Sequence, residues 1–257
     1  MIAQAFGDLT LLRFERLSRE PGLVHAVTTR PHNYAPHRGQ GAEMAVANRR
    51  RVCEILGVDF EKLTSPSQVH GGEVLPVEEA DVGRGRDGRN SALRFVDGLI
   101  CDIPGVPLIL MSADCPLVCA YDPDRPAVGA VHSSWQGTVA GATTQMIRLM
   151  ARRYGSDPAR LLTAIAPSAG PCCYEVGDEV RRIARTRMDD ADDFFSPHGD
   201  RFLFNLWEAN RRQLIAAGVR PEHIEIGGLC SICDHRLWSH RRDGAEAGRT
   251  ALVIAFR

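Results

Sequence analysis

The chain has 257 residues, 44% of them hydrophobic, and its 31 Lys and Arg residues nearly balance 32 Asp and Glu residues, for a formal net charge of -1. A chain of this length can bury one large core or two smaller ones, and we expect a single domain spanning residues 1–257. The near-zero charge gives no electrostatic footprint for nucleic acid or for an anionic membrane, so neither is expected as a partner. A small-molecule partner is favoured by elimination.

The opening stretch MIAQAFGDLTLLRFERL has neither a basic leader before an apolar run nor a small-residue cleavage site. No later segment has the roughly eighteen unbroken apolar residues of a membrane span. We therefore expect a cytoplasmic protein, in which cysteines serve as core thiols or metal ligands and not as a disulfide framework. The cysteines are Cys53, Cys101, Cys115, Cys119, Cys172, Cys173, Cys230 and Cys233.

Apolar and β-branched runs predict strands along most of the chain, and several lack the polar alternation of a half-exposed strand. The predicted strands cover residues 24–29, 73–77, 97–103, 106–112, 116–122, 127–133, 161–168, 223–229 and 250–256. Helical patterns lie between them, at residues 42–56, 138–155, 177–188 and 205–218. Interleaved strands and helices predict an α/β fold, a single layered domain with mixed β-sheets flanked by helices. Residues 30–41 and 78–94, rich in Gly, Pro or charge, are predicted surface loops.

Three residues at the ends of predicted strands are candidate metal ligands. His70 lies in SQVHGGEV, Cys115 in SADCPLV and His132 in AVHSSWQG. Soft or borderline metals favour Cys together with His, and three such ligands leave a fourth tetrahedral position for water or substrate. Because the three lie far apart in sequence, core or surface roles remain the alternative.

The Asp114-Cys115-Pro116 triplet interrupts two buried strands. A thiolate at Cys115 is costly in an apolar interior unless a cation pairs with it, which a bound metal would do. Asp114 is then a candidate catalytic residue, either orienting a ligating histidine or moving a proton, with a plain turn before Pro116 as the alternative.

Other segments also carry charged or thiol groups. In GPCCYEVG, Glu175 is a candidate acid or base beside a turn that approaches an anion, unless the paired cysteines merely pack. Arg241, Arg242 and Arg249 are candidate phosphate-binding residues, or else a solvated face. Cys230 and Cys233 form a CxxC, but without a second CxxC a zinc ribbon is not expected.

The segments SQVHGGEV, DGLICDIPGVPLILMSADCPLVCAYD, GAVHSSWQGTVAG, IAPSAGPCCYEVGDEV and SHRRDGAEAGRTALVIAF resemble the YfiH family, from about Val24 to the C-terminus. That family is also called laccase-domain or multicopper polyphenol oxidoreductase-like and, in recent usage, purine nucleoside phosphorylase. The resemblance implies a zinc site at His70, Cys115 and His132, a layered α/β fold and activity on purine nucleosides. Gln136 stands where the family reads arginine, at a position implied to bind phosphate or substrate.

The leading hypothesis is a zinc-dependent enzyme that cleaves adenosine, inosine or methylthioadenosine with phosphate to free base and ribose 1-phosphate, and that also deaminates adenosine. A copper-dependent polyphenol oxidoreductase is an alternative, although the histidines contain no His-x-His pair. A peptidoglycan-precursor editing factor and a cysteine hydrolase using Cys115 with His132 are two others. A monomer and a homodimer both remain open.

Overall fold

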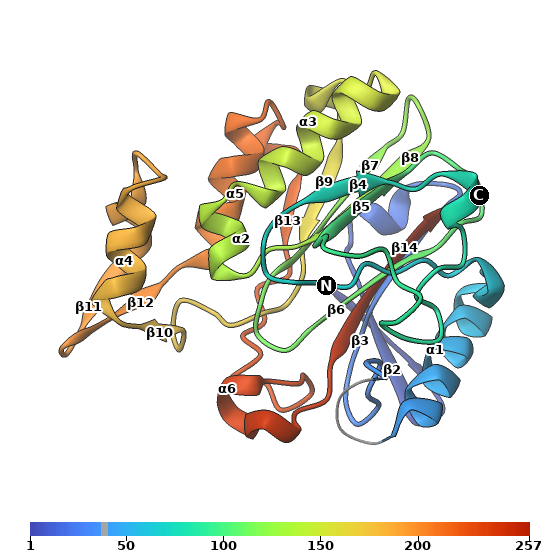
Figure 1. Ribbon diagram of the computed structural model, residues 1–257, viewed down its shortest axis with the longest axis horizontal. Helices are drawn as coiled ribbons and strands as arrows, with labels where there is room; N and C mark the ends of the chain where they lie inside the picture. Colours follow the sequence, from blue (N-terminus) through green and yellow to red (C-terminus); the bar gives the residue numbers. More distant parts are fainter. Residues whose placement is uncertain (37–40) are drawn as a thin grey trace.

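The structure is a computed structural model that describes residues 1–36 and 41–257. Two β-sheets pack face to face, and helices cover their outer sides (Figure 1). The mixed α/β fold predicted from the sequence is confirmed. Part of the predicted loop 30–41, residues 37–40, lies outside the described residues.

The first sheet is antiparallel throughout and has the order β1-β2-β3-β14-β6. Its strands are β1 (Ile2–Phe6), β2 (Leu9–Arg13), β3 (Leu23–Thr28), β6 (Leu108–Ser112) and β14 (Thr250–Phe256). Sequence analysis predicts neither β1 nor β2. The edge strand β1 is almost wholly exposed, so its sequence lacks the period-two pattern that marks a half-buried strand.

The second sheet is mixed and has the order β13-β9-β7-β8-β5-β4, with parallel pairing only at its two outer pairs among the described strands. Its strands are β4 (Val74–Pro76), β5 (Gly98–Cys101), β7 (Leu117–Asp122), β8 (Ala127–His132), β9 (Leu162–Ile165) and β13 (Ile224–Ile226). All of the predicted strands lie in these two large sheets. The β7–β8 hairpin is central, and its end carries two of the predicted metal-site segments.

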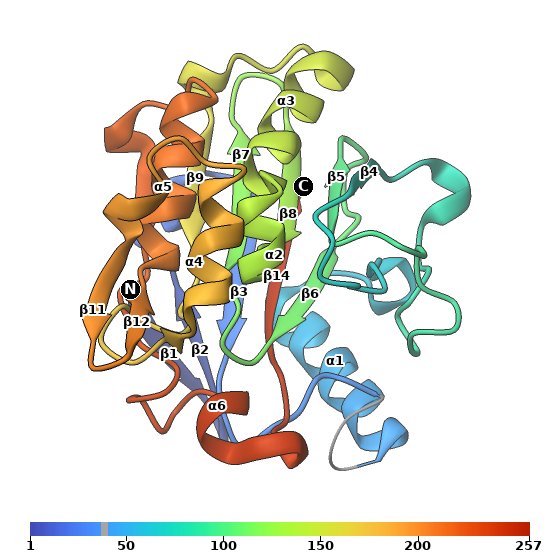
Figure 2. The same ribbon diagram turned by 60° about the vertical axis from the view of Figure 1, so that its left-hand side comes forward.

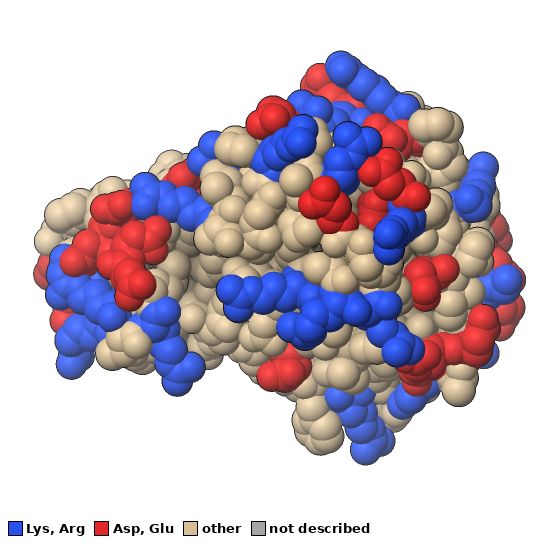
Figure 3. Space-filling model, turned by 90° about the horizontal axis from the view of Figure 1, so that it is seen from above, with Lys and Arg blue, Asp and Glu red and all other residues tan. Residues whose placement is uncertain are grey.

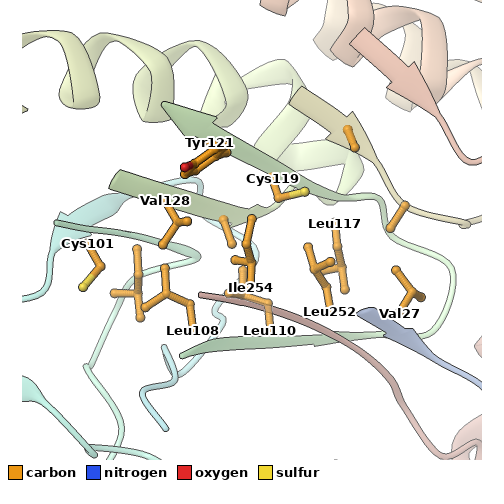
Figure 4. Packing of buried hydrophobic residues seen from close by; sticks show 14 of the residues in the cluster. Val27, Cys101, Leu108, Leu110, Leu117, Cys119, Tyr121, Val128, Leu252 and Ile254 are labelled. Carbon is orange, nitrogen blue, oxygen red and sulfur yellow. The ribbon is translucent and has the colours of Figure 1, made fainter. Parts of the chain in front are cut away.

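The main core fills the space between the two sheets (Figure 4). Leu110 and Leu252 from the first sheet meet Leu117, Cys119 and Val128 from the second, and all five are at most 1% exposed. Each such large apolar side chain contributes roughly 1.5–3 kcal/mol when fully buried. The strands are therefore held rigidly, and the residues at their ends have fixed positions.

Helices close the two outer faces. α1 (Ala42–Leu56) packs on the first sheet, whereas α3 (Ala142–Tyr154) and α5 (Leu206–Ala216) cover the second (Figure 1). The sequence predicts one continuous helix at 138–155, and this is wrong, because two helices lie there. α2 (Trp135–Val139) ends before Gly141, whose positive φ of 75° interrupts the helix before α3 begins. Glycine adopts this left-handed conformation at no steric cost, so the chain turns there between two helices.

A small lobe protrudes beside the second sheet (Figure 1) and lies in front of α5 in Figure 2. It contains α4 (Asp178–Arg185) and a three-stranded antiparallel sheet of β10 (Glu175–Val176), β12 (Arg201–Phe204) and β11 (Phe195–His198). The lobe, at the left of Figure 3, carries both charge signs side by side, as expected from ion pairs such as Arg185–Asp192 at 2.8 Å. Sequence analysis predicts α4 but not the short strands, nor α6 (His240–Asp243) near the C-terminus.

No helix in the described parts of the chain is long and apolar enough to cross a bilayer.

His25 gives the core a titrating group. It lies on β3, is 1% exposed, and its Nε2 accepts a hydrogen bond from the Phe14 amide at 2.9 Å, so that nitrogen carries no proton. Burial, assisted by the charge of Arg13, lowers the pKa of His25 to about 4.

A histidine whose pKa is depressed by folding has no effect on stability well above its unfolded pKa of 6.5, and it destabilises the fold as the pH falls from 6.5 toward 4, because only the unfolded chain takes up the proton. We expect wild-type protein to lose about 2 kcal/mol more unfolding free energy than His25→Gln between about pH 7 and pH 5, because glutamine retains an acceptor but does not titrate. Urea unfolding at the two pH values measures this. His235→Gln, at an exposed histidine, is the matched control, and an equal pH dependence in His25→Gln would contradict the prediction.

Candidate metal centre and cavity

Three predicted ligands meet at one end of the second sheet. The ligating atoms of His70, Cys115 and His132 all lie within 4.8 Å of one another. His132 ends β8 and pairs with Leu117 of β7, two residues beyond Cys115, so strand pairing alone brings these two together. His70 arrives from the loop before β4, and its ring meets that of His132 edge to face, with centroids 4.8 Å apart.

Asp97, directly before β5, holds the two histidines in place. Its Oδ1 accepts a hydrogen bond from the His70 amide at 2.9 Å and lies 3.0 Å from Nδ1 of His132, while its Oδ2 accepts from the Gly71 amide at 2.7 Å. Burial raises the pKa of this carboxyl, but the contact with His132 and the amide hydrogen bonds outweigh it and lower the pKa to about 2. Since Nδ1 of His132 is taken by Asp97, Nε2 is left to face the site.

Cys115 and His132 form a charged pair. Burial opposes charge on both, yet the neighbouring His132 and His70 lower the pKa of the Cys115 thiol to about 6. Likewise Cys115 and Asp97 raise the pKa of His132 to about 9 against the effect of burial. Both shifts favour a thiolate beside an imidazolium, and a divalent ion would take the place of the imidazolium proton. One thiolate with two imidazoles is a donor set that fits zinc, with one tetrahedral position left open.

The backbone around the site is bent in an unusual way. His70, Asp114 and Gln68 have positive φ values of 65°, 93° and 47°, a left-handed region that residues with a side chain rarely adopt. The side-chain amide of Gln68 forms two hydrogen bonds with the backbone of Met111 on β6. Its Nε2 donates to the Met111 carbonyl at 2.6 Å, and its Oε1 accepts from the Met111 amide at 2.9 Å. Such strain persists only where the surroundings enforce it, and here it turns side chains into the site.

A cavity of about 350 Å³ opens beside the three ligands. This volume lies within the range of small-molecule sites. Tyr174 and Met111 contribute to its wall, and four arginines also line it, Arg49, Arg89, Arg241 and Arg249. A cavity with this lining suits a ligand that combines a flat apolar part with an anionic group.

Of the other predicted site residues, Asp114, Arg241 and Arg249 line the cavity. The Asp114 carboxylate accepts hydrogen bonds from the Ser231 hydroxyl at 2.6 Å and from the Arg241 amide at 2.7 Å. The carboxylate in contact with a ligating histidine is Asp97 and not Asp114. Asp114 therefore ties the chain segment of α6 to the end of β6.

Gln136, Glu175 and Arg242 do not line the cavity. Gln136 is exposed on α2. The Glu175 side chain pairs with His198 at 3.0 Å, and its carbonyl accepts from Arg241 at 2.8 Å. The Arg242 guanidinium is held by Asp243 and by backbone carbonyls, among them that of Ser231 at 2.7 Å. The structure thus brings the three metal ligands together with Asp114, Arg241 and Arg249, and leaves these other three outside.

Sequence analysis missed Asp97, Gln68, Arg49 and Arg89. Asp97 did carry a signal, since it is an acidic residue directly before a fully buried strand. Arg49 lies in a helix with an ordinary amphipathic pattern, although its side chain is 1% exposed and donates to the Tyr34 and Gly85 carbonyls. Only the fold places it at the cavity.

Two packed sheets with a cavity beside a Cys/His cluster place this chain among the α/β proteins that bind small molecules. The family model described as multi-copper polyphenol oxidoreductase laccase matches residues 17–257. The chain belongs to this family, and the predicted YfiH resemblance is confirmed.

Several relatives carry enzyme names. "Purine nucleoside phosphorylase YlmD" of Geobacillus stearothermophilus is 36% identical over 88% of this chain and 83% of its own length. "Adenosine deaminase RL5" from an unknown prokaryotic organism is 31% identical over 85% of this chain and 84% of its own. The crystal structure of Bacillus licheniformis YfiH superposes with a TM-score of 0.89 at 31% identity, covering 97% of this chain and 96% of that one.

Proposed function

We propose that this chain is a zinc-dependent purine nucleoside phosphorylase of the cytoplasm, which converts adenosine, inosine or methylthioadenosine and phosphate to free base and ribose 1-phosphate. The observation that carries the proposal is the meeting of Cys115, His70 and His132 at a cavity lined by arginines. The relatives named purine nucleoside phosphorylase support it.

In phosphorolysis a phosphate oxygen forms a bond to the anomeric carbon as the bond from that carbon to the base nitrogen breaks, and the electron pair leaves with the base. The reaction needs phosphate held in line and a proton or donor for the departing base. Arg241, Arg249 and Arg89 are the groups we assign to phosphate, because a guanidinium donates two parallel hydrogen bonds to its oxygens. Arg89 makes no hydrogen bond or ion pair through its side chain to another described residue, so it is available for a ligand.

The roles of the metal ligands, Asp114 and Glu175 are assigned from their positions at or beside the cavity. A zinc ion bound by the three ligands would supply Lewis acidity and lower the pKa of a water molecule to about 7. Asp114 lines the cavity, and we assign it the proton transfer to the base. Glu175 acts through its carbonyl, which holds the Arg241 side chain, and is therefore a positioning residue.

Deamination of adenosine is a second candidate activity of the same cavity. Three protein ligands leave one coordination position open, as water activation requires. The relative named adenosine deaminase supports this reading. A polyphenol oxidoreductase that uses copper and a peptidoglycan-precursor editing factor remain further candidates. The metal content of protein grown without added copper separates the first of these from the zinc enzyme.

Phosphate dependence tests the proposal directly. Zinc-loaded protein should release free base and ribose 1-phosphate from adenosine only when phosphate is present, since phosphate is the nucleophile. Chromatography of the products with and without phosphate measures this, and released ammonia reports deamination separately. Base release at an equal rate without phosphate would indicate hydrolysis, and no base release from any purine nucleoside would rule the proposal out.

A further inference from the structure

Four cysteines outside the cavity converge on one point. Cys172 and Cys173 follow β9 in the connection to the lobe, and Cys230 and Cys233 follow β13. Their sulfur atoms all lie within 4.8 Å of one another. A zinc ribbon was not expected from the sequence, because the chain has no second CxxC. In the fold, the adjacent cysteines Cys172 and Cys173 take the place of that second pair.

The spacing of the sulfur atoms suits a single tetrahedral ion. Zinc binds thiolate at about 2.3 Å, so four thiolates around it stand roughly 3.8 Å apart. The Cys233 sulfur lies 3.7 Å from that of Cys172 and 3.1 Å from that of Cys173. Four sulfur ligands without an open position are typical of structural zinc sites.

The backbone around Cys230 prepares its sulfur for negative charge. The Gly170 amide donates to the Cys230 sulfur at 3.2 Å. Amide hydrogen bonds to a ligating sulfur fix its orientation in the way that outer-shell donors do at other metal sites.

The cluster joins the loop that carries Tyr174 of the cavity wall to the loop after β13, which contacts Asp114 of that wall. The loops already touch through backbone hydrogen bonds, from the Ser168 amide to the Leu229 carbonyl at 3.2 Å and from the Ser231 amide to the Ser168 carbonyl at 2.9 Å. Tyr174 follows the first pair of cysteines and lines the cavity. Ser231 lies inside the CxxC and donates to Asp114.

We propose that Cys172, Cys173, Cys230 and Cys233 bind one zinc ion in a closed four-thiolate site, distinct from the centre at Cys115. The ion clamps the connection to the lobe against the loop after β13, and so fixes Tyr174 at the cavity and Ser231 against Asp114. Each cysteine gives up its proton when the ion binds, which makes binding stronger as the pH rises.

The test counts metal in Cys115→Ser protein, from which the cavity ion is removed. Elemental analysis should find one zinc ion per chain in this variant and none in Cys115→Ser/Cys233→Ser. Cobalt loaded into Cys115→Ser should give the intense thiolate-to-cobalt charge-transfer absorption of an all-sulfur site. Cys115→Ser/Cys101→Ser, which changes a core thiol outside both clusters, should keep the ion.

Three results would overturn the proposal. The first is a Cys115→Ser protein free of metal, with its seven remaining thiols reactive after unfolding. The second is an intact mass lower by two hydrogen atoms, which indicates a disulfide between Cys173 and Cys233. The third is iron in place of zinc. The measurement on Cys115→Ser alone decides the matter if the double variant does not fold, and it does not depend on nucleoside activity.

Discussion

Cys115→Ser is expected to lose the cavity metal and to lower kcat/KM for nucleoside phosphorolysis by about three orders of magnitude. A hydroxyl at this position is far less acidic than a thiol whose pKa is about 6, so it offers no anion to the ion or to His132. A bound metal contributes several kcal/mol of transition-state stabilisation, and each 1.36 kcal/mol is a factor of ten in rate. Steady-state kinetics on zinc-loaded protein measure the loss.

Cys119→Ser is the matched control, because Cys119 lies four residues along on β7 in the core between the sheets. It should lose some stability and keep both its activity and its metal. Phosphorolysis by Cys115→Ser at the wild-type rate would show that the chemistry does not use the metal. If Cys115 is instead alkylated rapidly by iodoacetamide whether or not a chelator is present, a cysteine hydrolase replaces the metal enzyme.

The metal centre could be predicted from the sequence because its residues lie at strand ends, where side chains of adjacent strands meet. Cys115 and His132 flank the β7–β8 hairpin, whose apolar runs predict two strands. The third ligand, His70, depends on a loop with left-handed backbone that no periodicity reveals. Its position beside the predicted strand at residues 73–77 made it a candidate, and the family resemblance then implied it as a ligand.

The site features that the sequence does not predict depend on contacts between segments that are distant in the chain. Asp97 is a carboxylate before a strand until the fold brings the His70 loop and His132 to it, 27 and 35 residues away. The four cysteines are two unremarkable pairs until the loops after β9 and β13, about 60 residues apart, lie side by side. Local sequence patterns predict helices and strands. Contacts such as those of Asp97 and of the four cysteines depend on how the loops bring distant segments together, which local patterns do not show.

Asp97→Asn is expected to lower the unfolding free energy by about 3 kcal/mol or more and the zinc affinity of the cavity site by 10- to 100-fold. Both Asp97 oxygens accept: Oδ1 from His70 and His132, and Oδ2 from the amides of Gly71 and Gly72. An asparagine nitrogen cannot accept, so one pair of buried donors loses its partner, at about 1–3 kcal/mol each. The rest of the loss comes from His132, whose ring is no longer oriented by a carboxylate.

Urea unfolding and competition with a chelator measure the two effects of Asp97→Asn. Asp102→Asn, at an exposed carboxylate just beyond β5, is the control and should change neither. The four-cysteine site gives an internal reference, because Asp97 touches none of its residues and its zinc should stay bound while the cavity zinc is stripped. A variant with wild-type stability and affinity would mean that the four donors find other partners. The cavity would then owe its geometry to the strand ends alone and not to this buried carboxylate.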